Sequence, residues 1–150
     1  NNVLTISKFG MAKRTRLGSG QMINQYEENG QKVVDESGED VFERDGYRKT
    51  NRGTKGVRTM SLNEGDEIIS VRQIPNLSDQ LFMLTKSGMM IRLAANQTKE
   101  TRGKVAKGTR IMELRNKDKN GYNDEIIFVA RLPSELIEEN NDDDSSEEEE

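Results

Sequence analysis

Arginine and lysine side chains stand between small residues at two places in this sequence. The first is the run T-N-R-G-T-K-G at residues 50–56, and the second is the looser run T-R-G-K-V-A-K-G at residues 101–108. Cationic side chains beside glycine, where backbone N–H groups are accessible, are suited to holding a phosphate group. One such run alone is typical of a soluble loop between strands. Its repetition favours binding of a polyanion.

Few residues are available for catalysis. The chain contains no histidine and no cysteine, which removes most transition-metal sites and the Ser-His and Cys-His nucleophile systems. The three tyrosines, Tyr26, Tyr47 and Tyr122, are interpreted as packing or loop-anchoring residues. We therefore expect no catalytic, metal-binding or cofactor-binding residue in this segment.

The charges are segregated along the chain, so the net charge of −4 is misleading. Residues 138–150 hold nine acids and no base, and residues 27–45 hold eight acids and two bases. The remaining residues hold 21 bases and 10 acids, a net charge of +11. A basic body with acidic appendages indicates a polyanionic partner and a built-in competitor for it.

Cations at comparable places in the two halves extend the two runs into a candidate binding set. No aromatic residue is interleaved with them, so base stacking on single strands is not expected. Neutralisation of the phosphates of a bent duplex fits better. The candidate residues are Lys13, Arg14, Arg16, Arg48, Lys49, Arg52, Lys55, Arg58, Arg92, Lys99, Arg102, Lys104, Lys107 and Arg110.

An internal repeat organises the positions of these cations. Four blocks align in the same order: residues 3–14 with 81–92, residues 51–53 with 101–103, residues 56–62 with 108–114, and residues 66–69 with 124–127. Matched blocks in the same order are the signature of a repeat architecture. Alternating apolar residues and glycine-bearing turns predict four short strands in each copy. The expected strands are residues 3–7, 11–15, 56–62 and 67–74 in copy one, and 80–85, 89–93, 108–114 and 125–132 in copy two.

Four antiparallel strands per repeat are typical of a β-propeller blade. We therefore predict an all-β protein with one blade at residues 3–75 and a second at 80–133. An acidic insert at about residues 20–47 interrupts the first blade and is expected to be a loop with one small hairpin at residues 32–42. Two blades cannot close a ring, and the chain starts in a strand-like run without methionine, so we expect the end of a longer chain. No apolar run is long enough to span a bilayer.

The repeated pattern resembles the blades of the C-terminal propeller, or β-pinwheel, of the gyrase A and topoisomerase IV A proteins. The family's gyrase box reads Q-R-R-G-G-K-G, and residues 50–56 match four of its seven positions, departing at Thr50, Asn51 and Thr54. Because the full box lies in the first blade of the family, this copy is similar to the degenerate form of a later blade. The resemblance implies two blades of a six-bladed propeller.

The resemblance to gyrase A also implies a function. It implies wrapping of double-stranded DNA by a bacterial, cytoplasmic type II topoisomerase that uses ATP to introduce negative supercoils. ATP and Mg²⁺ would then be bound elsewhere in the enzyme, and the partners would be the rest of gyrase A as a homodimer and the gyrase B protein, in an A2B2 assembly. The alternatives are the topoisomerase IV A propeller, which selects DNA crossings, and a protein-binding propeller. No membrane partner is expected.

The acidic run at residues 138–150 is expected to be disordered, because it cannot bury enough apolar surface to offset its chain entropy. Two interpretations stay open for it. It is either a solubilising tail or a competitor with DNA for the basic surface.

Overall fold

The computed structural model describes residues 1–102, 106–114 and 121–137. Lys104 and the acidic run at residues 138–150 lie outside the described residues. The described chain confirms the all-β expectation, with antiparallel strands and little helix. Its strands are β1 (Asn2–Ser7), β2 (Met11–Arg16), β3 (Met22–Asn24), β4 (Phe42–Arg44), β5 (Ile68–Ile74), β6 (Gln80–Thr85), β7 (Met90–Ala94), β8 (Thr109–Arg110) and β9 (Ile126–Leu132). A short 3-10 helix, η1, spans Ala95–Gln97.

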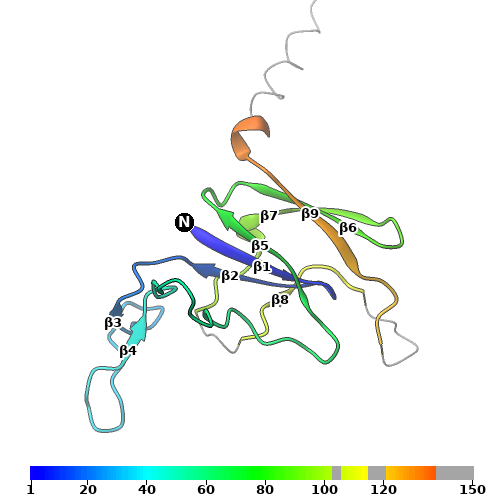
Figure 1. Ribbon diagram of the computed structural model, residues 1–150. Coiled ribbons are helices and arrows are strands. Elements are labelled where there is room, and N and C mark those ends of the chain that lie inside the picture. The colour runs from blue at the N-terminus through cyan, green and yellow to red at the C-terminus, as the bar shows by residue number, and fades with distance from the viewer. Residues whose placement is uncertain (103–105, 115–120, 138–150) are drawn as a thin grey trace, which may run out of the picture.

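The two copies of the repeat build two sheets of the same plan (Figure 1). In copy one, β1 lies between β2 and β5, and in copy two β6 lies between β7 and β9. The β1–β2 hairpin turns at Gly10 and the β6–β7 hairpin at Gly88, both with positive φ. Glycine adopts this conformation without the steric cost that a Cβ atom would add. Within the described residues, no helix is long and apolar enough to cross a membrane.

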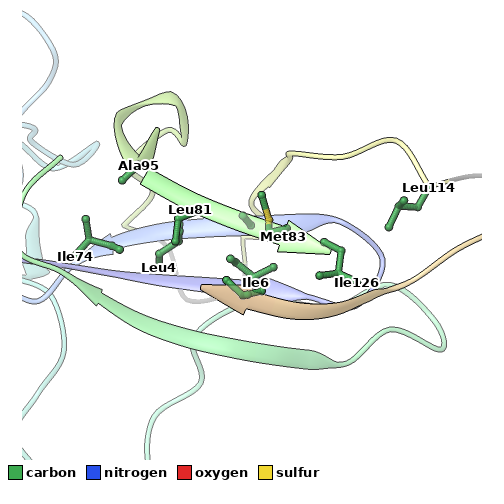
Figure 2. Packing of buried hydrophobic residues seen from close by; sticks show 10 residues of the cluster. Leu4, Ile6, Ile74, Leu81, Met83, Ala95, Leu114 and Ile126 are labelled. Atoms are coloured by element: carbon green, nitrogen blue, oxygen red, sulfur yellow. The ribbon is translucent and has the colours of Figure 1, made fainter. Parts of the chain in front are cut away.

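The core lies between the two sheets. Leu4 and Ile6 of β1 pack with Leu81 and Met83 of β6, and all four are fully buried (Figure 2). Along β6, buried residues alternate with half-buried ones, as a strand with one face on the core requires. Full burial of each such side chain contributes roughly 1.5–3 kcal/mol. Each copy therefore stabilises the other through a shared core.

The expectation that each copy completes its own four-stranded sheet is wrong. Residues 56–62 form no strand, and β8 of copy two pairs with β2 of copy one instead. The first sheet therefore has the order β5-β1-β2-β8, and the second has three strands among the described residues. A Cβ atom added to Gly108 would lie 2.2 Å from the carbonyl oxygen of Ala12, so β8 needs glycine to approach β2 this closely.

The acidic insert is more elaborate than the single hairpin at residues 32–42 that was expected. Strands β3 and β4 pair as a stem, and two tight turns at residues 27–30 and 35–38 extend from it. A ring of backbone hydrogen bonds joins the three arms: Gln25 N–H donates to Val41, Val41 N–H to Val33, and Val33 N–H to Gln25, at 2.8–2.9 Å. The insert is thus a built subdomain with its own hydrogen bonds.

Candidate nucleic-acid interface

Two cations of the candidate set are buried in the first sheet. Lys13 is 1% exposed and Arg14 is 8% exposed. The Lys13 ammonium donates to the carbonyl oxygen of Thr59 at 2.5 Å, and burial lowers the pKa of Lys13. The Arg14 guanidinium donates to the carbonyl oxygen of Thr98 at 2.7 Å and pairs with Glu100 at 3.4 Å. Their burial argues against the expectation that they contact a phosphate.

Lys13 and Arg14 instead hold two other segments in place. Consecutive residues of a strand point to opposite faces of the sheet. Arg14 shares the face of its register partner Leu4, which is in the core, and Lys13 shares the face of Thr5. On that outer face, Thr59 also bonds to the Thr5 hydroxyl at 3.0 Å. Strand β2 therefore anchors one segment of copy one and one segment of copy two.

In copy one the anchored residue, Thr59, directly follows residues 48–58, which we call the first basic segment. It holds five bases and no acid. Its turn is closed by the Thr54 hydroxyl, which donates to the carbonyl oxygen of Asn51 at 3.1 Å. The five cations are exposed, and none forms a side-chain hydrogen bond or ion pair with another described residue. They are Arg48, Lys49, Arg52, Lys55 and Arg58.

The segment of copy two is residues 99–110, which we call the second basic segment. It holds five bases and one acid. That acid, Glu100, is turned toward the buried Arg14. Thr101 N–H donates to the carbonyl oxygen of Arg14 at 2.8 Å, so the segment starts along the edge of β2 that faces away from β1. Among residues 99–102 and 106–110, the exposed charged side chains are therefore all cations.

The four cations of the second basic segment that the structure describes are all exposed, but three have partners. Arg102 pairs with Glu43, Arg110 pairs with Glu113 at 2.9 Å, and the Lys107 ammonium donates to Asn63 Oδ1 at 3.0 Å. Lys99 is exposed at the mouth of a cleft beside the acidic insert.

The chain that directly follows the first basic segment contacts the second basic segment. Ser61 N–H donates to the carbonyl oxygen of Ala106 at 3.2 Å, and Lys107 reaches Asn63 two residues further along. In Figure 1, residues 48–62 and the chain entering β8 run past the same side of β2. The residues that follow the first run therefore lie beside the second run, although the two runs are about fifty residues apart in the chain.

Two further candidates lie outside these segments. Arg16, at the end of β2, is exposed and has Asp45 at 3.8 Å. Arg92, in β7, donates to Gln80 and lies over the ring of Phe82 at 5.5 Å. The Arg92 side chain therefore contacts residues of its own sheet, and the Arg16 side chain lies near an acid at the base of the acidic insert.

Sequence reasoning missed the acidic residue that reaches the second basic segment. Glu43 of β4 and Arg102 are 59 residues apart, and no spacing rule or motif links them. The charge pattern alone predicts a competitor, without indicating where it would act. Among residues 1–102, 106–114 and 121–137, no group of three Asp or Glu side chains gathers as a metal site.

Comparison with known proteins follows the same division of the chain. The family described as "DNA gyrase C-terminal domain, beta-propeller" matches residues 1–19, 41–75 and 79–120. The match passes over most of the acidic insert. Antiparallel sheets built from a repeat, with one strand contributed across the copies, define a propeller-type module. The chain belongs to the DNA gyrase C-terminal β-propeller family.

Individual relatives agree with this assignment. The chain is 32% identical over 89 residues to the DNA gyrase A protein of Metamycoplasma arthritidis, covering 59% of this chain and 9% of that protein. It is 32% identical over 83 residues to the DNA gyrase A protein of Borreliella burgdorferi, covering 55% of this chain and 10% of that protein. The matched part therefore spans about a tenth of the length of these relatives.

A solved structure supports the fold. The structure of a DNA gyrase A C-terminal domain superimposes with a TM-score of 0.58 and 17% identity, covering 88% of this chain and 33% of that one. This likeness extends the agreement across nearly the whole chain and confirms the propeller-type, β-pinwheel fold class.

Proposed function

We propose that this chain is a duplex-binding part of a DNA gyrase A protein and bends DNA over its two basic segments. The observation that carries the proposal is the first basic segment, whose five cations are exposed with no acidic partner among the described residues. When unpaired cations neutralise phosphates, counterions condensed on the DNA are released, and that release drives duplex binding. Family membership supports the same reading.

The binding would be insensitive to base sequence. Lysine and arginine on glycine-bearing loops reach phosphate oxygens from outside the duplex, and such contacts position a protein without reading bases. Lys13 and Arg14 hold Thr59 and Thr98, the residues next to the two segments, on strand β2. We propose that a duplex in contact with both segments bends, and that the phosphate contacts offset the energetic cost of bending.

The wider activity belongs to the whole enzyme. We propose that the chain serves an ATP-dependent type II topoisomerase that introduces negative supercoils, and that this segment holds no catalytic residue. ATP and Mg²⁺ would be bound in other parts of that enzyme. Its partners would be double-stranded DNA, the rest of gyrase A as a homodimer and the gyrase B protein, in the bacterial cytoplasm.

Removing two cations from the first basic segment tests the proposal. The double variant Arg52→Ala, Lys55→Ala should weaken binding of a mixed-sequence duplex about ten- to a hundredfold at low salt. Each lost phosphate contact should lower the slope of log affinity against log salt by about 0.9. Fluorescence anisotropy titrations of a labelled duplex across a salt series measure both quantities.

A charge-matched control distinguishes the loss of cations at the proposed site from a general loss of positive charge. The double variant Lys32→Ala, Lys86→Ala also removes two exposed cations, but both lie outside the basic segments and have acidic partners. It should leave the salt slope near that of the wild type. If both double variants behave alike, the first basic segment is not the site of binding, and if the wild type does not bind duplex DNA at all, the proposed function fails.

A further inference from the structure

Equivalent arginines in the two repeats have different surroundings. Arg52 and Arg102 occupy the same place in the aligned copies, each followed by glycine. Arg52 has no ion pair with a described residue, whereas the guanidinium of Arg102 pairs with the carboxylate of Glu43. Glu43 belongs to the acidic insert of copy one. The insert therefore reaches across and occupies a cation of copy two.

Glu43 is held in place by the stem of the insert. It lies in β4, opposite Ile23 of β3. Its neighbour Arg44 donates to the carbonyl oxygen of Gly20 at 2.7 Å. The Glu43 side chain is only 19% exposed, whereas that of Arg102 is 57% exposed. The carboxylate is thus the fixed member of the pair, and the arginine is the one that can turn outward.

A second carboxylate, that of Asp45, adds negative charge at the base of the insert. Asp45 accepts a hydrogen bond from Ser19 N–H at 2.9 Å and has Arg16 at 3.8 Å. Hydrogen bonds from Ser19 lower the pKa of Asp45, and the charges of Arg16 and Arg102 add to this effect. Asp45 therefore stays ionised beside the same two cations.

The cleft between insert and second basic segment carries the same mixture of charges. It has a volume of about 880 Å³, and its charged lining residues are Glu27, Glu28, Glu43 and Arg44 from the insert and Lys99, Glu100 and Arg102 from the second basic segment. A phosphate entering this cleft meets cations and carboxylates together. Duplex binding at the second basic segment thus has to compete with the insert.

We propose that the acidic insert is an intramolecular competitor for DNA, in which Glu43 takes the place of a phosphate on Arg102. This inference rests on the proposed function and adds a regulation of the same surface. In the DNA-free protein the first basic segment presents charge without acidic partners, so it makes the first contact. The second basic segment engages after Arg102 turns from Glu43 to a phosphate, which the exposed guanidinium can do without movement of the stem.

The charge-removing variant Glu43→Gln tests this competition in the intact chain. It should tighten duplex binding severalfold and make affinity fall about threefold more between 50 and 200 mM salt, the amount expected for about one added phosphate contact. Glu39→Gln is the matched control, because it removes one charge from a turn of the same insert. Glu39 has no side-chain hydrogen bond or ion pair with the described residues, so this control should change affinity much less.

Removal of Arg102 in two backgrounds sharpens the test. Arg102→Ala should weaken binding little in the wild type, where Glu43 already neutralises the arginine, and about threefold or more in the Glu43→Gln background. Equal losses in both backgrounds would overturn the competition. Weaker binding by Glu43→Gln would overturn it too, since it would mean that Glu43 orients Arg102 for DNA.

Thermal unfolding followed by circular dichroism checks that each variant is folded. Glu43→Ala serves as the second variant, because a small side chain at this position needs no polar partner, and it should tighten binding as Glu43→Gln does. A wild type that binds duplex DNA, with both Glu43 variants binding no more tightly, rejects this inference and leaves the proposed function standing. A wild type that does not bind duplex DNA rejects both.

Discussion

Replacing Gly108 by alanine should unfold the junction between the two copies, and Gly56 provides a matched control. The two glycines align in the repeat and both have a φ of +80°. Alanine in this conformation costs about 1–2 kcal/mol. Reduced freedom of the unfolded chain offsets about 0.4–1 kcal/mol of it. Gly56→Ala should therefore destabilise the protein by about 1 kcal/mol.

Gly108→Ala carries a further cost because of its neighbours. Its Cβ atom would lie 2.2 Å from the Ala12 carbonyl oxygen and 2.8 Å from the Ala12 carbonyl carbon, whereas no described atom lies within 4 Å of a Cβ atom at Gly56. Backbone atoms cannot turn aside as a side chain can, so β8 must leave β2. That breaks the ladder and the hydrogen bond from Ile111 N–H to Gly10, each bond being worth about 0.5–1.5 kcal/mol.

The expected total loss for Gly108→Ala is about 3–5 kcal/mol, several times that of Gly56→Ala. Urea unfolding measured by far-ultraviolet circular dichroism gives both values, since the chain has no tryptophan for fluorescence. Equal destabilisation by the two variants would refute the reasoning. It would mean that β8 does not pair with β2 in solution and that strain at positive φ is the whole effect.

Two other predictions concern charged groups that support the sheets. Lys13→Met keeps an apolar stem of similar length but removes the donor to Thr59, and should cost about 1–3 kcal/mol in urea unfolding. Because burial lowers the pKa of Lys13 below 10.5, the wild type should gain stability as pH rises toward that value, and the variant should lack this gain. Desolvation raises the pKa of Asp124, but hydrogen bonds from Ser87, Thr85 and the Glu125 backbone outweigh it and hold the pKa at about 2. The stabilisation by Asp124 is therefore present above its ordinary pKa of 3.8 and is lost as pH falls from there toward 2. Acid titration of Asp124→Asn should show a smaller loss of stability in that pH range than the wild type shows. An unchanged profile would contradict the assignment.

Local pattern was sufficient for most of the fold. Alternation of apolar residues and glycine-bearing turns indicated the two hairpins around Gly10 and Gly88, and the repeat indicated that they are equivalent. Local pattern could not indicate which sheet residues 108–114 would join. Their apolar residues suit either copy, and the choice depends on the close approach of Gly108 to Ala12, which exists only in the folded protein.

The sequence composition predicted which cations could bind phosphate, and the structure shows that two of them are buried. Five cations in residues 48–58 are exposed as expected, since this stretch contains no acid and, among the described residues, no acid pairs with them. The sequence does not distinguish Lys13 and Arg14 from these exposed cations, because a cation can be buried only where the fold supplies a hydrogen-bond acceptor for it. Those acceptors lie 46 and 84 residues away.

The stem of the acidic insert leaves and rejoins the first sheet at a single point. Tyr47 N–H donates to the carbonyl oxygen of Leu17, and a Cβ atom at Gly46 would lie 2.1 Å from that same oxygen. Because this contact holds the two ends of the insert together, the residues between them can be lengthened or shortened at a small cost in loop-closure entropy. Residues 26–40 are therefore a suitable site for a label. Replacing the two turns with a dye-bearing loop or a short tag should leave β1 and β2 undisturbed.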